Sequence, residues 1–100
     1  MQIQIGELTV GDVGVNIIAT ADETLEGKTI RFEFIKPSGK MLNVAATATS
    51  GQTATYTTAA GDIDEAGTWR VMVFNGTTGF YYQSVAAFKV NDTPANMARG

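Results

Sequence analysis

The residues best able to do chemistry in this chain are carboxylates gathered in one short segment, Asp62, Asp64 and Glu65. Clustered carboxylates are ligands that Ca²⁺ accepts, so a calcium site is one interpretation of this segment. The spacing of an EF-hand loop is absent, however, and acidic loops are commonly only hydrated. We therefore favour a structural role for the segment and predict no metal site.

Other catalytic arrangements lack their usual partners. The chain contains neither His nor Cys, which removes the commonest general base and every thiolate ligand. Ser38 and Ser84 consequently have no His to activate them. Glu33 alternates outward on its predicted strand beside Arg31, as expected for a solvated cross-strand charge. The glycines mark turns and form no phosphate-binding loop. We expect no enzyme, no catalytic residue and no cofactor.

Charge and hydropathy limit the partners that the chain can bind. Its net charge is −3, with 7 Lys and Arg residues among 100, whereas a nucleic-acid-binding protein needs a basic face to neutralise phosphates. No apolar run approaches the roughly 20 residues that cross a bilayer, and the first residues lack the features of a signal peptide. We expect neither nucleic acid nor a membrane as a partner.

Alternation of apolar and polar residues predicts an all-β domain over residues 1–90, followed by a flexible tail over 91–100. Turn signals at intervals of about ten residues separate about seven strands, which favours an antiparallel β-sandwich over a parallel α/β sheet. The predicted strands cover residues 2–5, 15–20, 29–35, 41–49, 53–58, 68–74 and 80–90. The polar segment 21–28 is predicted to be a loop, with one helical turn capped by Asp22 as the less favoured alternative.

The acidic segment is expected to form a corner that positions the only Trp. In immunoglobulin-like sandwiches, an acidic turn precedes a Gly, one further residue and an aromatic that opens the penultimate strand. Gly67, Thr68 and Trp69 fit this pattern, and Val71 stands where true immunoglobulin domains carry a Cys. The fold class predicted is therefore an immunoglobulin-like sandwich. Its expected core residues are Phe32, Phe34, Trp69, Val71, Val73 and Phe88.

The last two predicted strands carry apolar residues on the side opposite this core. A slightly wide core, or cover from the tail, would account for them. A subunit interface would account for them equally well, because aromatic residues and Met are enriched at the centres of interfaces. The hairpin at Phe80, Tyr81 and Tyr82 is the expected point of contact. The interface residues of this hypothesis are Met72, Phe74, Phe80, Tyr81 and Val85.

Several short segments, taken in order and spacing, carry a family resemblance. They are Gly11-Asp12-Val13-Gly14, Lys36-Pro37-Ser38-Gly39, Tyr56-Thr57-Thr58, Gly61-Asp62-Ile63-Asp64 and Ala66-Gly67-Thr68-Trp69. With these segments, the chain resembles the short immunoglobulin-like proteins encoded in the structural gene clusters of tailed phages and prophages. It is similar also to the N-terminal domain of phage baseplate upper proteins. The resemblance covers roughly residues 10–90, and the Phe- and Tyr-rich final hairpin departs from it.

The resemblance implies a non-enzymatic component of the virion, made in the cytoplasm of a bacterial host: a capsid decoration, a fibre base, or a tail or baseplate adaptor. Its partners would be other virion structural proteins and further copies of itself, with edge strands able to pair between subunits. An alternative from another class is a carbohydrate-binding or adhesin-type module. In that module, exposed Tyr56, Phe80 and Tyr81 would stack on sugars.

Overall fold

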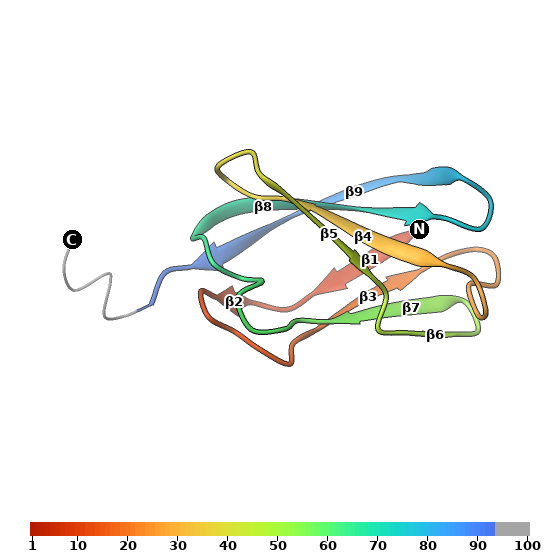
Figure 1. The fold of residues 1–100 in the computed structure, drawn as a ribbon, viewed down its shortest axis with the longest axis horizontal. Coiled ribbons are helices and arrows are strands. Elements are labelled where there is room, and N and C mark those ends of the chain that lie inside the picture. Colours follow the sequence, from red (N-terminus) through yellow and green to blue (C-terminus); the bar gives the residue numbers. More distant parts are fainter. Residues whose placement is uncertain (94–100) are drawn as a thin grey trace.

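The computed structural model describes residues 1–93, which form two β-sheets packed face to face (Figure 1). One sheet has the order β1-β3-β7-β6, from β1 (Gln2–Ile5), β3 (Asn16–Thr20), β7 (Thr53–Thr57) and β6 (Ala48–Ser50). The other has the order β2-β9-β8-β4-β5, from β2 (Leu8–Thr9), β9 (Phe80–Asn91), β8 (Gly67–Asn75), β4 (Ile30–Ile35) and β5 (Met41–Ala45). Within residues 1–93 there is no helix that is long and apolar enough to span a membrane.

The all-β prediction is confirmed, but residues 1–93 form nine strands where about seven were expected. Leu8 and Thr9 leave the sheet of β1 and pair in parallel with the end of β9. The expected strand 41–49 is divided because the chain passes from one sheet to the other at Ala46 and Thr47. Their N–H groups donate to carbonyls of opposite sheets, at 2.8 Å to Ile30 and 2.7 Å to Thr55.

The core between the sheets is built largely from aromatic rings. Trp69, Phe32, Val71 and Val73 have no exposed surface, and Phe34 is 1 % exposed. Phe88 is partly buried against this cluster, with its ring centroid 5.9 Å from that of Trp69. The segment 21–28 is the loop that we expected, and it adds Leu25 to the core.

Pairing between β8 and β9 determines which side chains face away from this core. Trp69 lies opposite Phe88, and Met72 lies opposite Val85. The register then shifts between Met72 and Phe74, so that Phe74 lies opposite Tyr81. Between these two pairs the chain advances by two residues on β8 and by four on β9. Both numbers are even, and therefore Tyr81 stays on the same side of the sheet as Val85. This bulge keeps the outward-facing residues of both strands on one surface.

The domain continues beyond the boundary predicted at residue 90. Asn91 belongs to β9, and its carbonyl accepts a hydrogen bond from Val10 N–H at 2.9 Å. The Asn91 side chain donates to Glu7 Oε1 at 2.9 Å. Of the predicted tail, residues 94–100 lie outside the described residues.

Candidate docking face

The five-stranded sheet presents an apolar patch on the side that faces away from the core, which we call the outer face. The patch consists of Met72, Phe74, Tyr81 and Val85. Tyr81 is 51 % exposed and Val85 is 59 % exposed, while Met72 and Phe74 are half-buried. The rings of Phe74 and Tyr81 lie with their centroids 4.8 Å apart. The structure thus brings these four predicted interface residues together on one surface.

Phe80, the fifth predicted interface residue, lies elsewhere. It precedes Tyr81 in an extended strand, so its side chain points to the other side of the sheet. There its ring meets Tyr82 edge-on at 5.2 Å, and the Tyr82 hydroxyl donates to Glu23. Phe80 is 42 % exposed, but it does not extend the apolar patch.

Glu33 lies on the outer face and is nevertheless only 5 % exposed. Its strand neighbours are Met72 on one side and Asn43 on the other. The hydroxyl of Tyr81 comes close to the Glu33 carboxylate, and its interaction with that carboxylate is the main reason that the pKa of Tyr81 is raised. The prediction of a solvated charge at Glu33 was wrong because side chains from β8 and β9 cover the carboxylate.

Basic residues surround the apolar patch. Arg31 lies opposite Phe74, Arg70 lies opposite Ala87, and Lys89 lies opposite Thr68, all on the outer face. The Arg31 side chain is held in place by hydrogen bonds to Asn43. Among the described strand residues of this face, Glu33 is the one acidic side chain. The outer face is therefore locally basic, although the whole chain has a net charge of −3.

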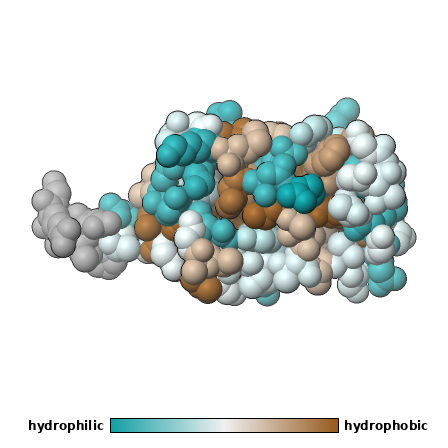
Figure 2. Space-filling view, viewed as in Figure 1, coloured by the Kyte–Doolittle hydropathy of each residue, from teal (hydrophilic) through white to brown (hydrophobic). Residues whose placement is uncertain are grey.

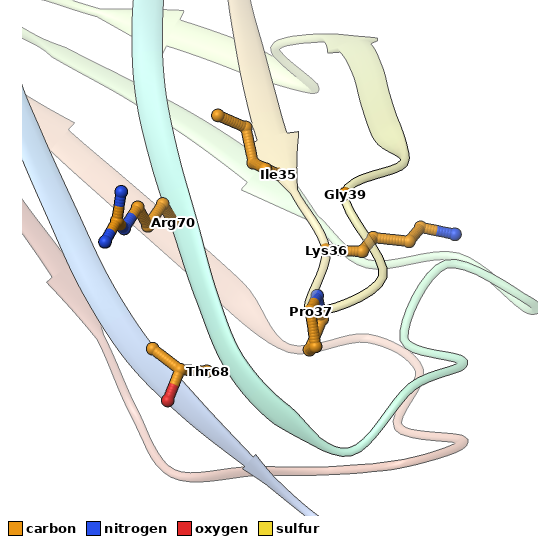
Figure 3. A pocket seen from close by; sticks show the side chains of 6 residues that line it. All are labelled: Ile35, Lys36, Pro37, Gly39, Thr68 and Arg70. Atoms are coloured by element: carbon orange, nitrogen blue, oxygen red, sulfur yellow. The ribbon is translucent and has the colours of Figure 1, made fainter.

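A hollow of about 310 Å³ lies at the hairpin end of the outer face (Figure 3). Figure 3 shows Arg70 and Ile35 on neighbouring strands, with Pro37 in the hairpin loop beside them. The Lys36 side chain points away from Arg70, which leaves Arg70 as the cation beside the hollow. The residues that line it are Ile35, Lys36, Pro37, Gly39, Thr68 and Arg70.

The acidic corner fastens this hairpin to the start of β8. Lys36 Nζ forms an ion pair with Asp64 Oδ1 at 2.9 Å. The Glu65 carboxylate accepts hydrogen bonds from the Ser38 N–H at 3.1 Å and the Ser38 hydroxyl at 2.8 Å. The backbone carbonyl of Glu65 also accepts from Trp69 Nε1 at 2.9 Å. These carboxylates therefore serve internal contacts that position the hairpin and Trp69.

Asp62 has a separate structural role within the same segment. Its carboxylate accepts a hydrogen bond from the Tyr56 hydroxyl and another from the Ala59 N–H at 2.8 Å. Within residues 1–93, no group of three acidic side chains is arranged to hold a metal ion.

Tyr56 is buried, with 7 % of its surface exposed. Its ring packs beside those of Phe32 and Phe34, at centroid distances of 6.2 and 6.0 Å. Burial, together with the hydrogen bond to Asp62, raises the pKa of Tyr56 to about 12. The predicted role of Tyr56 in stacking on a sugar is therefore wrong.

The sequence reasoning missed the basic residues around the patch and the burial of Glu33. The alternation of β8 and β9 already placed Arg70 and Lys89 on the same side as Met72 and Val85. Counting the charged residues on each side of these two predicted strands would therefore have found Arg70 and Lys89. The contact between Tyr81 and Glu33 leaves no such signal, because it depends on the order of three strands.

Comparisons with protein-family models, with curated protein sequences and with solved structures find no match for this chain. The resemblance to phage proteins therefore rests on the short sequence segments given above. Any functional assignment must be argued from the outer face itself.

Proposed function

We propose that this chain is a non-enzymatic structural protein of a phage virion that docks onto another virion protein through its outer face. It would serve as a capsid decoration, a fibre base, or a tail or baseplate adaptor. The observation that carries the proposal is an exposed apolar patch with a basic border on a protein of net charge −3. The virion assignment draws its support from the sequence resemblance.

The strand order supports the immunoglobulin-like part of the proposal. The sheet β1-β3-β7-β6 corresponds to strands A, B, E and D of an immunoglobulin domain, and the run β9-β8-β4 corresponds to G, F and C. Trp69 lies on β8, the counterpart of strand F, whereas antibody domains bury their Trp on strand C. On β4, the counterpart of strand C, Phe32 and Phe34 occupy the core instead.

The partner that best fits this face is a flat apolar surface bordered by carboxylates. The aromatic and Met side chains of the patch suit the dry centre of an interface. Arg31 and Arg70 lie where they can pair with acidic groups around it, and Arg is frequent among the residues that dominate binding energy. Two copies of this chain meeting through their outer faces would oppose like charges, so the face favours a different protein.

Many copies on a symmetric lattice would strengthen weak docking. Each contact need supply only modest affinity, because simultaneous engagement of neighbouring copies raises the overall avidity. A small domain with one docking face suits such repetitive binding.

The test begins with the genes beside this one. A neighbouring major capsid gene would favour decoration, neighbouring baseplate genes would favour an adaptor, and the absence of virion genes would contradict the virion assignment. The encoded neighbour is then purified, and its dissociation constant is measured for the wild-type chain, Val85→Glu and Val13→Glu. Val13 is a matched control, because it is 60 % exposed against 59 % for Val85 and lies outside the outer face.

We expect Val85→Glu to weaken binding by about tenfold or more, since it buries a carboxylate in the apolar centre of the contact. Val13→Glu should leave the dissociation constant unchanged. Equal binding by the wild-type chain and Val85→Glu would show that the outer face is not the contact.

A carbohydrate-binding or adhesin module is the alternative that the exposed, paired rings of Phe74 and Tyr81 favour. A glycan array screened with the wild-type chain and Tyr81→Ala separates the two functions. Sugar binding that Tyr81→Ala abolishes, with no affinity for a virion protein, would establish this alternative.

A further inference from the structure

The strand β5 (Met41–Ala45) forms an open edge of the five-stranded sheet, where it pairs with β4 alone. Two hydrogen bonds bracket this pairing: Lys36 N–H to the Lys40 carbonyl at 2.8 Å, and Ala46 N–H to the Ile30 carbonyl at 2.8 Å. In an antiparallel ladder, the residues that bond to the neighbouring strand alternate. The backbone groups at positions 41, 43 and 45 therefore point away from β4, toward the open edge.

This edge lacks the features by which proteins usually block strand addition. Such features are charged side chains, Pro, bulges and very short strands. β5 has no charge and no Pro, and its register with β4 is unbroken. The other edge strands differ: β2 has 2 residues and β6 has 3. Beside β1, the Ser84 hydroxyl donates to the Met1 carbonyl at 2.8 Å.

We infer that β5 joins two copies of this chain, which pair antiparallel about a two-fold axis at Asn43. In this register, Met41 lies opposite the partner's Ala45, and Asn43 lies opposite the partner's Asn43. Each opposed pair can exchange two backbone hydrogen bonds. Arg31 Nη2 reaches the Asn43 carbonyl only at 3.4 Å, so this acceptor keeps capacity for a second donor.

The side chains fit the same register. The long side chain of Met41, which is 58 % exposed, would lie beside the small one of Ala45. On the core side, Leu42 would lie beside the partner's Val44. Both are now half-buried at the edge of the sandwich, and in the middle of Figure 2, where β5 crosses in front, hydrophobic surface lies beside a hydrophilic group.

The side-chain sizes favour a second copy over an unrelated strand, because the same register places a long side chain beside a small one at both ends of the pairing. Lys40 would lie opposite Ala46, and the two copies of Arg31, each hydrogen-bonded to its own Asn43, would be the like charges nearest to the axis. This pairing leaves the outer face open and joins the two five-stranded sheets into one. It is therefore independent of the proposed docking function, and either can fail without the other.

The test is the oligomeric state, measured by sedimentation velocity over a range of concentrations. We expect the wild-type chain to form a dimer. Asn43→Lys should weaken the dimer by at least tenfold, because it places identical charges opposite each other at the axis, whereas Asn43→Glu should weaken it less, because Arg31 lies beside the new carboxylate. An equimolar mixture of the two variants should recover the dimer, because the opposed charges are then complementary.

Gln4→Lys is the matched control, since it adds the same charge at an exposed position of β1, an edge strand of the other sheet. It should leave the dimer intact. Amide hydrogen exchange of the wild-type chain provides a readout that needs no variant. Protection at residues 41, 43 and 45 should increase with protein concentration. A wild-type chain that stays monomeric, or variants that dimerise like it, would overturn the inference.

Discussion

The hydroxyl of Tyr81 on β9 approaches the carboxylate of Glu33 on β4 closely enough to raise the pKa of Tyr81, although β8 lies between these two strands. This contact spans the outer face of the sheet and lies beside the rings of the apolar patch. It involves a carboxylate that points away from the core and is nevertheless only 5 % exposed.

Tyr81→Phe tests this contact while keeping the aromatic ring. We expect a lower midpoint of urea denaturation, because the Glu33 carboxylate loses a polar neighbour while it stays covered. A double-mutant cycle with Glu33→Gln should show that the two substitutions are not additive. Additive effects would mean that the two side chains do not interact in solution.

Gly67→Ala should destabilise the corner strongly. Gly67 has a φ of +129°, and a Cβ at this position would lie 2.9 Å from Pro37 Cγ. We expect a cost of about 2–4 kcal/mol in the free energy of unfolding, from backbone strain and overpacking together. Urea denaturation measures it, with Gly79→Ala as the control, since Gly79 has a φ of +81° and open space around it.

The control substitution should cost only about 1–2 kcal/mol. Adding Pro37→Ala to Gly67→Ala should recover part of the loss, because it removes Pro37 Cγ, the nearer of the two atoms that the new Cβ would meet, and leaves Pro37 Cβ at 3.2 Å. Equal costs for Gly67→Ala and Gly79→Ala would contradict the close packing between the hairpin and the corner.

Tyr56 makes stability depend on alkaline pH. Its pKa is about 12 in the folded protein, against an ordinary value of 10.0. Below pH 10 the phenol is neutral in both states, so its contribution to stability is complete. As the pH rises from 10 to 12, the unfolded chain loses this proton first, and stability falls.

Tyr56→Phe should therefore be less stable at neutral pH by about 1–2 kcal/mol, from the lost hydrogen bond to Asp62. Its stability should also fall less steeply between pH 10 and 12 than that of the wild-type chain. Denaturation at several pH values measures both effects, and parallel curves for the two proteins would refute the assignment.

The proposed contact with a virion protein should weaken as salt increases. Basic residues around the patch would pair with carboxylates of the partner, and such pairs are screened at physiological ionic strength and above. Arg70→Gln should lower the affinity and also flatten its salt dependence. Binding titrations at several salt concentrations measure this, and an affinity unaffected by salt would contradict a basic border that takes part in docking.

Strand alternation predicted much of this molecule. It assigned Trp69, Val71 and Val73 to one side of β8, and the structure places all of them in the core. It also placed Met72 and Val85 on the other side, where they now lie opposite each other. Local patterns sufficed here because the side-chain period of a strand is a property of the backbone.

Features that depend on distant strands could not be predicted in this way. Alternation continues through residues 41–49 without a Gly or Pro, yet the chain changes sheets there because Ile30 and Thr55 accept its N–H groups. Glu33 was expected to be solvated because its own strand carries no sign of the Tyr81 ring that reaches it. The sequence pattern describes each strand, whereas the order of strands decides which residues meet.

The central claim is that the outer face docks onto a virion protein, and hydroxyl-radical footprinting of the complex tests it most directly. Tyr81 and Phe80 are adjacent, similarly exposed and on opposite sides of β9, so each serves as a reference for the other. On addition of a capsid or baseplate protein that is found to be encoded beside this chain, oxidation of Tyr81, Phe74 and Met72 should fall while that of Phe80 persists. Unchanged oxidation of Tyr81 in a complex that protects the strands β1, β3 and β7 would contradict the claim.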